Sequence, residues 1–424
     1  MEYLIVALAA LTLILVVNAS LDGAMARRAL FVLLLAFAIR LVVHVLVLRP
    51  GLIEYGGDNH GYEGDAMEIV RLWRLEGIHF VTADESPYMQ SVAVPCNVFA
   101  LIMYVCGGLA PLACTAFVAL LACVLCVIMY RLARVVGATE QGAFRLLVVV
   151  AFMPALLLHT ADTYKDGFSA FLVVACVGIG VSLSQRFALS KLLLSGGLLW
   201  CLWHVRPYMV FMCAVPLVLG MAVSKTRLSV RRLFALSALL ATGMLVFVGA
   251  YDNTLIEEGQ QQLDQGQSTV VRSGNADGGS GIEFTDGGSA WSALGPKLLY
   301  TVLSPFPWSS GSLTLQMGKI DVLLWYFLLF SAVRGAGRLW HHDRHTLLQL
   351  LAFIVPSIIV YATTMANVGL ILRQRIPIEL ITSLLAAVVW SRLSQAGSPS
   401  ESPGDDSSAA PDQAAKPLTP QRLP

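Results

Sequence analysis

The chain has 424 residues, of which 57% are hydrophobic and 13% are charged, and its formal net charge is +1. A composition this apolar excludes an ordinary soluble domain and predicts an integral membrane protein. The near-zero charge, with no basic patch among aromatic residues, argues against nucleic acid as a partner. The cysteines lie almost entirely within or beside apolar runs and show no CxxC pair or Cys/His metal spacing, so we expect no structural disulfide and no zinc site.

About eleven apolar stretches can cross a hydrocarbon layer of roughly 30 Å, which predicts an all-α, polytopic transmembrane bundle. They cover residues 3–19, 30–48, 111–130, 144–158, 167–183, 188–203, 207–223, 233–250, 320–333, 347–364 and 376–390. A further stretch, 92–109, fits a helix that lies along the membrane interface. The first stretch lacks the basic region of a secretory signal, so we expect a retained anchor over 1–25. A transmembrane catalytic module over 26–395 and a disordered cytoplasmic tail over 396–424 follow.

Lys and Arg are concentrated in certain loops, which the positive-inside rule assigns to the cytoplasm. These segments are 27–28, 131–134, 186–191, 225–232 and 334–344. The chain alternates correctly between them only if 92–109 does not cross the membrane. The amino terminus then lies outside and the carboxyl terminus inside. With this topology we expect five loops to face outward: 49–110, 159–166, 204–207, 251–319 and 365–375.

The first outward loop carries an acidic motif followed by an amphipathic helix. Its apolar stripe consists of Tyr62, Ala66, Ile69, Val70 and Trp73. A helix of this kind lies on the membrane surface and would hold Asp58 and Asp65 near the lipid headgroups, where an acceptor and a lipid-linked donor can meet. The alternative is a solvated acidic turn in which Asp58 only caps the helix.

A second outward turn, 159–166, lies between two closely spaced spans and presents Asp162, Lys165 and Asp166 at the membrane edge. A lysine beside an aspartate suits a negatively charged headgroup together with a base. An exposed ion pair that caps the next helix is the alternative.

Several arginines lie where a membrane protein disfavours them. Arg373 and Arg375 precede the last span on the outer side, and a lipid-linked phosphate is a natural partner for their guanidinium groups. Snorkelling toward outer headgroups is the alternative. Arg206 poses the same choice. Arg40 lies in mid-span, where a charge usually points toward a partner or a polar cavity.

These features occur in a fixed order along the chain: Arg40 in a span, the Asp58–Tyr62–Ala66 motif, the turn of Asp162 to Asp166, and the entry Arg373–Arg375–Pro377. The order resembles that of the GT-C superfamily of multi-span glycosyltransferases, which use polyprenyl-phosphate-linked sugars on the outer membrane face. The resemblance covers most of the chain from Arg40 to Trp390. It implies interfacial helices in the first outer loop.

The resemblance also implies that a carboxylate of the first loop activates the acceptor hydroxyl. Asp58 is the best match, while Glu63-Gly64-Asp65 looks like the family's acidic triplet and leaves Asp65 open. Two departures are an additional amino-terminal span and the lack of a large soluble carboxyl-terminal domain. The second argues against the oligosaccharyltransferase branch and for a compact transferase.

The expected reaction is therefore an inverting glycosyl transfer from polyprenyl phosphate to a glycan, lipid or protein acceptor, outside a cell (inner) membrane. Candidate catalytic residues are Asp58, Asp65 and Asp166. Candidate substrate-binding residues are Tyr62, Glu63, Asp162, Lys165, Arg206, Arg373, Arg375 and Arg40. Asp58 and Asp166 could hold Mg²⁺ or Mn²⁺, which prefer oxygen ligands, although the sequence requires no metal.

Three alternatives stay open at this stage. A polymerase or ligase of surface polysaccharide would use the same outer arginines on a pyrophosphate-linked glycan. A lipid or glycan transporter would instead spread ionisable residues through its spans and show repeated halves, and neither is found here. The third alternative is a non-catalytic membrane scaffold.

Overall fold

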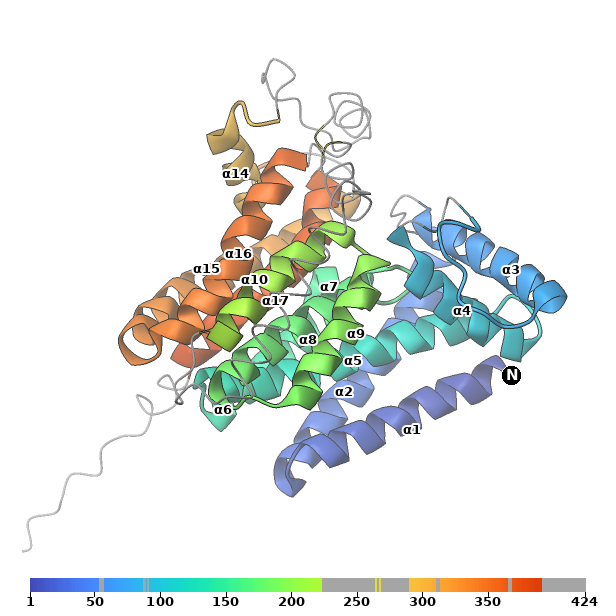
Figure 1. Ribbon diagram of the computed structural model, residues 1–424, viewed down its shortest axis with the longest axis horizontal. Coiled ribbons are helices and arrows are strands. Elements are labelled where there is room, and N and C mark those ends of the chain that lie inside the picture. The colour runs from blue at the N-terminus through green and yellow to red at the C-terminus, as the bar shows by residue number, and fades with distance from the viewer. Residues whose placement is uncertain are drawn as a thin grey trace, which may run out of the picture.

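In a computed structural model of the chain, residues 1–52, 57–86, 89, 91–222, 264, 267, 290–309, 313–364 and 368–390 are described. Every long element in these ranges is a helix (Figure 1), which confirms the predicted all-α bundle. In chain order the helices are α1 (Glu2–Ser20), α2 (Gly23–Val43), η1 (His44–Leu48), α3 (Asp58–Glu76), α4 (Ala93–Cys106), α5 (Pro111–Val136), α6 (Glu140–Ala151), α7 (Pro154–Leu158), α8 (Asp166–Gln185), α9 (Leu189–Trp203), α10 (Pro207–Ala222), α14 (Leu294–Leu303), α15 (Leu313–His342), α16 (Arg344–Thr364) and α17 (Val368–Val389).

Six of the described helical segments are long and apolar enough to cross a membrane, by length and composition. They are Glu2–Ser20, Gly23–Leu48, Pro111–Val136, Asp166–Gln185, Gly318–His342 and Arg344–Thr364. The described helices thus identify a membrane protein but do not establish eleven spans. The predicted span 233–250, most of the loop 251–319 and the tail 396–424 lie outside the described residues.

One predicted span is divided in the structure. The apolar run 144–158 forms two helices, α6 and α7, with Phe152 and Met153 between them. The cause is Pro154, which lacks an N–H group and disfavours helical backbone in the residue before it. Pro154 instead begins α7, where its missing N–H costs nothing.

The amphipathic helix of the first outward loop forms as expected and becomes α3. Ala66, Ile69, Val70 and Trp73 of its predicted stripe are buried, and Tyr62 is half-buried. α3 and α4 lie together at one end of the molecule, beside the amino-terminal end of α1 (Figure 1). α4 has 14 residues, about 21 Å of helix, which is too short to cross the membrane.

α17 lies in the middle of the bundle, with nearly every residue from Arg375 to Val388 buried. α15 packs closely along it: a Cβ atom added at Gly335 would lie 1.8 Å from the carbonyl oxygen of Leu385. Only glycine allows this approach, and small residues at helix contacts are typical of membrane bundles. The central position of α17 brings its two arginines within reach of several other helices.

Candidate functional site

Arg373 of α17 joins two aspartates that lie far away in the sequence. Its Nη1 donates to Asp58 Oδ2 at 2.5 Å, and its Nε donates to Asp166 Oδ2. Asp166 Oδ1 also accepts a hydrogen bond from Arg206 Nη2 at 2.5 Å. Four segments therefore meet here: the start of α3, the start of α8, the loop before α10, and α17. We call Asp58, Asp166, Arg206 and Arg373 the arginine–aspartate cluster.

The two aspartates of this cluster differ in exposure. The side chain of Asp58 is 42% exposed, whereas that of Asp166 is 2% exposed and enclosed between two guanidinium groups. Asp58 can therefore meet an incoming molecule. Asp166 instead holds Arg206 and Arg373 in position.

Each of these carboxylates is placed by the start of a helix. Asp58 is the first residue of α3, and Asp166 is the first residue of α8. The amino-terminal turn of a helix carries partial positive charge, which favours an acidic side chain there. Two such turns converge on Arg373, so local sequence preference and tertiary pairing agree.

Aromatic residues and a lysine surround the arginine–aspartate cluster. The guanidinium carbon of Arg373 lies 5.3 Å from the ring centroid of Tyr164. Burial raises the pKa of Tyr62 and of Tyr164, so both phenols stay protonated and can donate hydrogen bonds. Lys165 Nζ donates to the backbone oxygen and the hydroxyl of Ser91 at 3.2 and 3.3 Å. Burial, and then the charge of Arg206, lower the pKa of Lys165 to about 8.

Asp162 and Glu63 belong to a second, adjacent network. Arg49 Nη2 donates to Asp162 Oδ1 at 2.9 Å and also binds Glu63. Asn59 Nδ2 donates to Asp162 Oδ2 at 2.9 Å, and His44 Nδ1 lies 3.3 Å from Asp162 Oδ1. Burial acts to raise the pKa of Asp162, but the hydrogen bond from His44 and the charge of Arg49 lower it overall. This network joins the second outward turn to α3.

Arg49 was missed in the sequence, although one signal was present. It is a cation on the outward side of a span, the same anomaly that singled out Arg373 and Arg375. Its side chain is 22% exposed, which leaves it accessible at the end of the bundle that holds α3.

Arg40 is fully buried and supports the turn 159–166. Its Nε donates to Thr160 Oγ1 at 2.8 Å, and its Nη1 donates to the carbonyl of Ala36 at 3.0 Å. These contacts fix the start of the turn that carries Asp162, Lys165 and Asp166. Arg40 therefore supports this turn and makes none of the ion pairs of the arginine–aspartate cluster.

Arg375 does not join Arg373 in the cluster. Its Nε donates to Glu379 Oε1 at 2.5 Å, and its Nη1 donates to the carbonyl of Ser304, beyond the end of α14, at 2.9 Å. The sequence placed both arginines in a loop, but α17 begins at Val368 and includes them. Two residues apart on a helix, side chains point about 200° apart, so the arginines face different neighbours.

Asp65, the alternative to Asp58, lies about two turns further along α3. It is partly buried, and burial raises its pKa. Among the residues that the structure describes, none forms an ion pair with Asp65. The arrangement thus distinguishes Asp58, the better match in the sequence, from Asp65, which the sequence left open as an alternative.

Comparison with known proteins informs the fold. The chain matches no protein-family model, and no curated protein matches it. Among solved structures, the archaeal oligosaccharyltransferase AglB from Archaeoglobus fulgidus, in complex with an inhibitory peptide and a dolichol-phosphate, is similar with a TM-score of 0.50 and 13% identity. The match covers 87% of this chain and 51% of that chain, so this protein spans about half the length of its neighbour. The described chain therefore has a GT-C-like fold.

Proposed function

We propose that the protein is a membrane glycosyltransferase that moves a sugar from a polyprenyl-phosphate donor to an acceptor on the extracytoplasmic face. One observation carries the proposal: Arg373 is shared between an exposed carboxylate, Asp58, and a buried one, Asp166. The fold supports it, because the similar enzyme holds a dolichol-phosphate.

In the proposed reaction, the acceptor hydroxyl attacks the anomeric carbon of the sugar from the side opposite the lipid phosphate. Asp58 takes the hydroxyl proton as the new carbon–oxygen bond forms. The bond to the phosphate breaks at the same time, and the polyprenyl phosphate leaves with the electron pair. The configuration at the anomeric carbon is inverted.

The cations of the site stabilise the departing phosphate. Arg373 and Arg206 are nearly buried, where a guanidinium group is worth more to a phosphate than in water. Lys165 adds a third charge while it is protonated. Asp166 keeps the two guanidinium groups oriented, so it acts as a positioning residue. The guanidinium of Arg373 binds both Asp58 and Asp166, so the proposal routes no step through a metal held by these carboxylates.

The test uses the full chain in lipid nanodiscs and a panel of polyprenyl-linked sugars, with release of polyprenyl phosphate as the readout. Asp58→Asn keeps the size and one oxygen acceptor but cannot take a proton, so we expect release to fall about 10²- to 10⁴-fold. Asp65→Asn on the same helix is the matched control and should stay within a few-fold of the unaltered protein.

Other results would contradict the proposal in distinct ways. Release of polyprenyl pyrophosphate from a glycan-loaded lipid indicates a polymerase or ligase. If release of polyprenyl phosphate falls by this amount in Asp65→Asn and is unchanged in Asp58→Asn, the base is Asp65. Transport of labelled lipid across the bilayer without release of either product indicates a transporter.

A further inference from the structure

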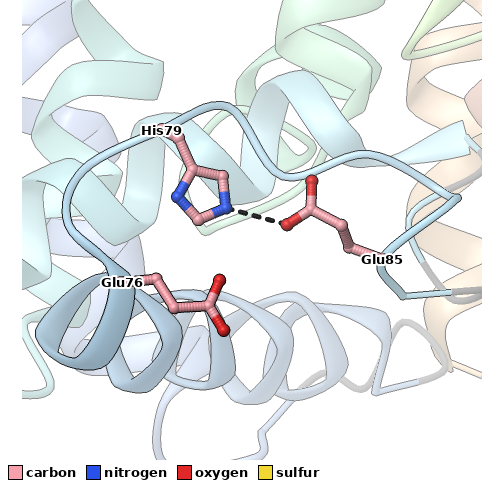
Figure 2. Close-up of side chains that lie close together, drawn as sticks. All are labelled: Glu76, His79 and Glu85. Carbon is pink, nitrogen blue, oxygen red and sulfur yellow. Dashed lines mark hydrogen bonds and ion pairs between the residues drawn. The ribbon is translucent and has the colours of Figure 1, made fainter.

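A second group of chemically active side chains lies at the opposite end of α3 from Asp58. Glu76 is the last residue of α3, and His79 and Glu85 belong to the following loop. Figure 2 shows their three side chains directed toward a common space. One ligand atom from each residue lies within 4.8 Å of the other two. His79 and Glu85 are 34% and 38% exposed, so solutes reach the group.

The imidazole of His79 is oriented by a backbone carbonyl. Its Nδ1 lies 2.9 Å from the oxygen of Gly77, and a carbonyl can only accept, so Nδ1 carries the hydrogen. Its Nε2 lies 2.8 Å from Glu85 Oε2, which is also an acceptor. At this distance the two atoms form a hydrogen bond when Nε2 is protonated, and a cation that replaces the proton could bind both atoms after a small shift. A histidine that donates one N–H to a carbonyl and presents its other nitrogen is the usual arrangement at metal centres.

The loop is held firmly on several sides of His79. Trp73 Nε1 donates to the backbone oxygen of His79 at 2.7 Å. Phe80 packs against a tryptophan near the end of α9. Both backbone groups of Val81 bond to the side-chain amide of Asn97 in α4, at 3.0 and 2.9 Å. The position of His79 is therefore fixed by α3, α4 and α9 before any ligand arrives, which favours tight binding.

The local charge favours a divalent cation. Glu76 lies at the carboxyl end of α3, where the helix already carries partial negative charge and an acidic residue is disfavoured. Gly77 has a φ of +89°, which ends the helix and turns the chain back toward Glu76. Two carboxylates and an inward-turned carbonyl thus surround one imidazole, and a cation would offset this excess.

We infer that Glu76, His79 and Glu85 bind a zinc ion, with water as the fourth ligand. Histidine nitrogen and carboxylate oxygen are both ligands that Zn²⁺ accepts in proteins, whereas Mg²⁺ and Ca²⁺ prefer oxygen alone. The sequence-based expectation of no zinc site considered cysteine-containing patterns, and no cysteine takes part here. The inference does not rest on the proposed glycosyl transfer.

The zinc ion would join the end of α3 to the loop 77–86. This loop leads to Ser91, whose backbone oxygen and hydroxyl accept hydrogen bonds from Lys165. The metal would therefore fix the loop 77–86 to α3 and so stabilise its position against the bundle.

The experiment titrates Zn²⁺ into full-length, chelator-treated protein in nanodiscs and measures bound zinc per chain and the melting temperature. We expect one tightly bound zinc, a raised melting temperature, and an absorption-edge spectrum with one imidazole and otherwise oxygen ligands. His79→Gln should weaken binding at least about tenfold. The matched controls are Glu68→Gln, an exposed carboxylate on the same helix, and His341→Gln, at the end of α15; both should bind as the unaltered protein does.

Asp58→Asn separates this centre from the arginine–aspartate cluster, because it should retain the zinc. Zinc that is lost in Asp58→Asn but kept in His79→Gln would overturn the inference and place the metal at the other end of α3. Equal binding by His79→Gln and the unaltered protein would also overturn it, as would no binding at all. In the last case the positive charge at Nε2 is a proton.

Discussion

Arg373 and Arg375 differ in what they can do, although they are two residues apart and equally anomalous in the sequence. Arg373 faces the outward carboxylates, one of which is exposed. Arg375 is 2% exposed, pairs with Glu379 and donates to carbonyls in the last turn of α14 and just after it. A phosphate would have to displace these buried partners to reach Arg375. At the scale of single residues, the geometry therefore assigns anion binding to Arg373 and a structural role to Arg375.

The pKa of Lys165 leads to a pH prediction. Burial lowers this pKa from its ordinary value of 10.5 to about 8, so the charge of Lys165 is present below pH 8 and disappears above it. The KM for the lipid-linked donor should then rise as the pH passes through 8. Arginine stays charged throughout, so Lys165→Arg should show a flat KM from pH 7 to 9. The same alkaline rise in both proteins would show that Lys165 does not bind the donor.

The same shift affects stability with a definite sign. The unfolded chain keeps the lysine proton up to about pH 10.4, whereas the folded chain loses it near pH 8. The unfolded state therefore binds more protons between these values, and the free energy of unfolding contributed by Lys165 rises with pH in that window. Thermal unfolding in detergent should show this rise in the unaltered protein and not in Lys165→Arg.

At the scale of elements, the bundle depends on close contact between helix backbones. α15 and α17 approach until no side chain fits at Gly335, and this contact positions the helix that carries Arg373. Apolar patterns predict which segments form helices, but they do not report which faces of two helices touch. Gly335 is the sequence feature that indicates where the two helices touch.

Two substitutions on α15 test the contact. A Cβ at Gly335 would meet the Leu385 backbone, so Gly335→Ala should lower the free energy of unfolding by about 1–3 kcal/mol. A Cβ at Gly337 meets nothing within 4 Å, so Gly337→Ala should be neutral or stabilising by up to about 1 kcal/mol. Melting curves in detergent distinguish them. Equal effects would show that α15 and α17 are not in backbone contact.

At the scale of the whole molecule, the two ends of the central helix α17 meet different charged groups among the described residues. The acidic starts of α3 and α8 meet Arg373 near the start of α17. At the other end, Arg145 and Arg338 donate to carbonyls of Trp390 and Val388, at the end of α17, at 2.8 and 3.0 Å. Cations at the carboxyl end of a helix are favourable, so Arg145 of α6 and Arg338 of α15 also stabilise the central helix.

The topology can be tested by labelling introduced cysteines with a membrane-impermeant maleimide. Asp84→Cys lies exposed in the loop after α3, and Gln141→Cys lies exposed near the start of α6. We expect intact cells to label the first only, and the second to react after permeabilisation. The unaltered protein measures background from native cysteines, most of which are buried. The reverse pattern would place the arginine–aspartate cluster in the cytoplasm.

Local signals were readable from the sequence, and long-range pairings were not. The apolar stripe predicted the buried face of α3, with Ala66, Ile69 and Val70 buried as expected. The same periodicity put Glu63 off the stripe, yet Glu63 is buried because Arg49 neutralises it. That partner is 14 positions away in the chain, directly after η1. A single sequence shows which charged residues lie in unusual positions, but not which of them pair in the fold.

α3 carries a different ionic centre at each end, and its length limits how the two can communicate. Asp58 and Glu76 are 18 residues apart, about 27 Å along the helix axis. Physiological salt screens surface charges over about 8 Å, so the separation exceeds three screening lengths. A change of charge at Glu76 and His79 therefore leaves the electrostatic potential at Asp58 almost unchanged. Any influence of the group at Glu76 and His79 on Arg373 would therefore require that α3 moves as a rigid body.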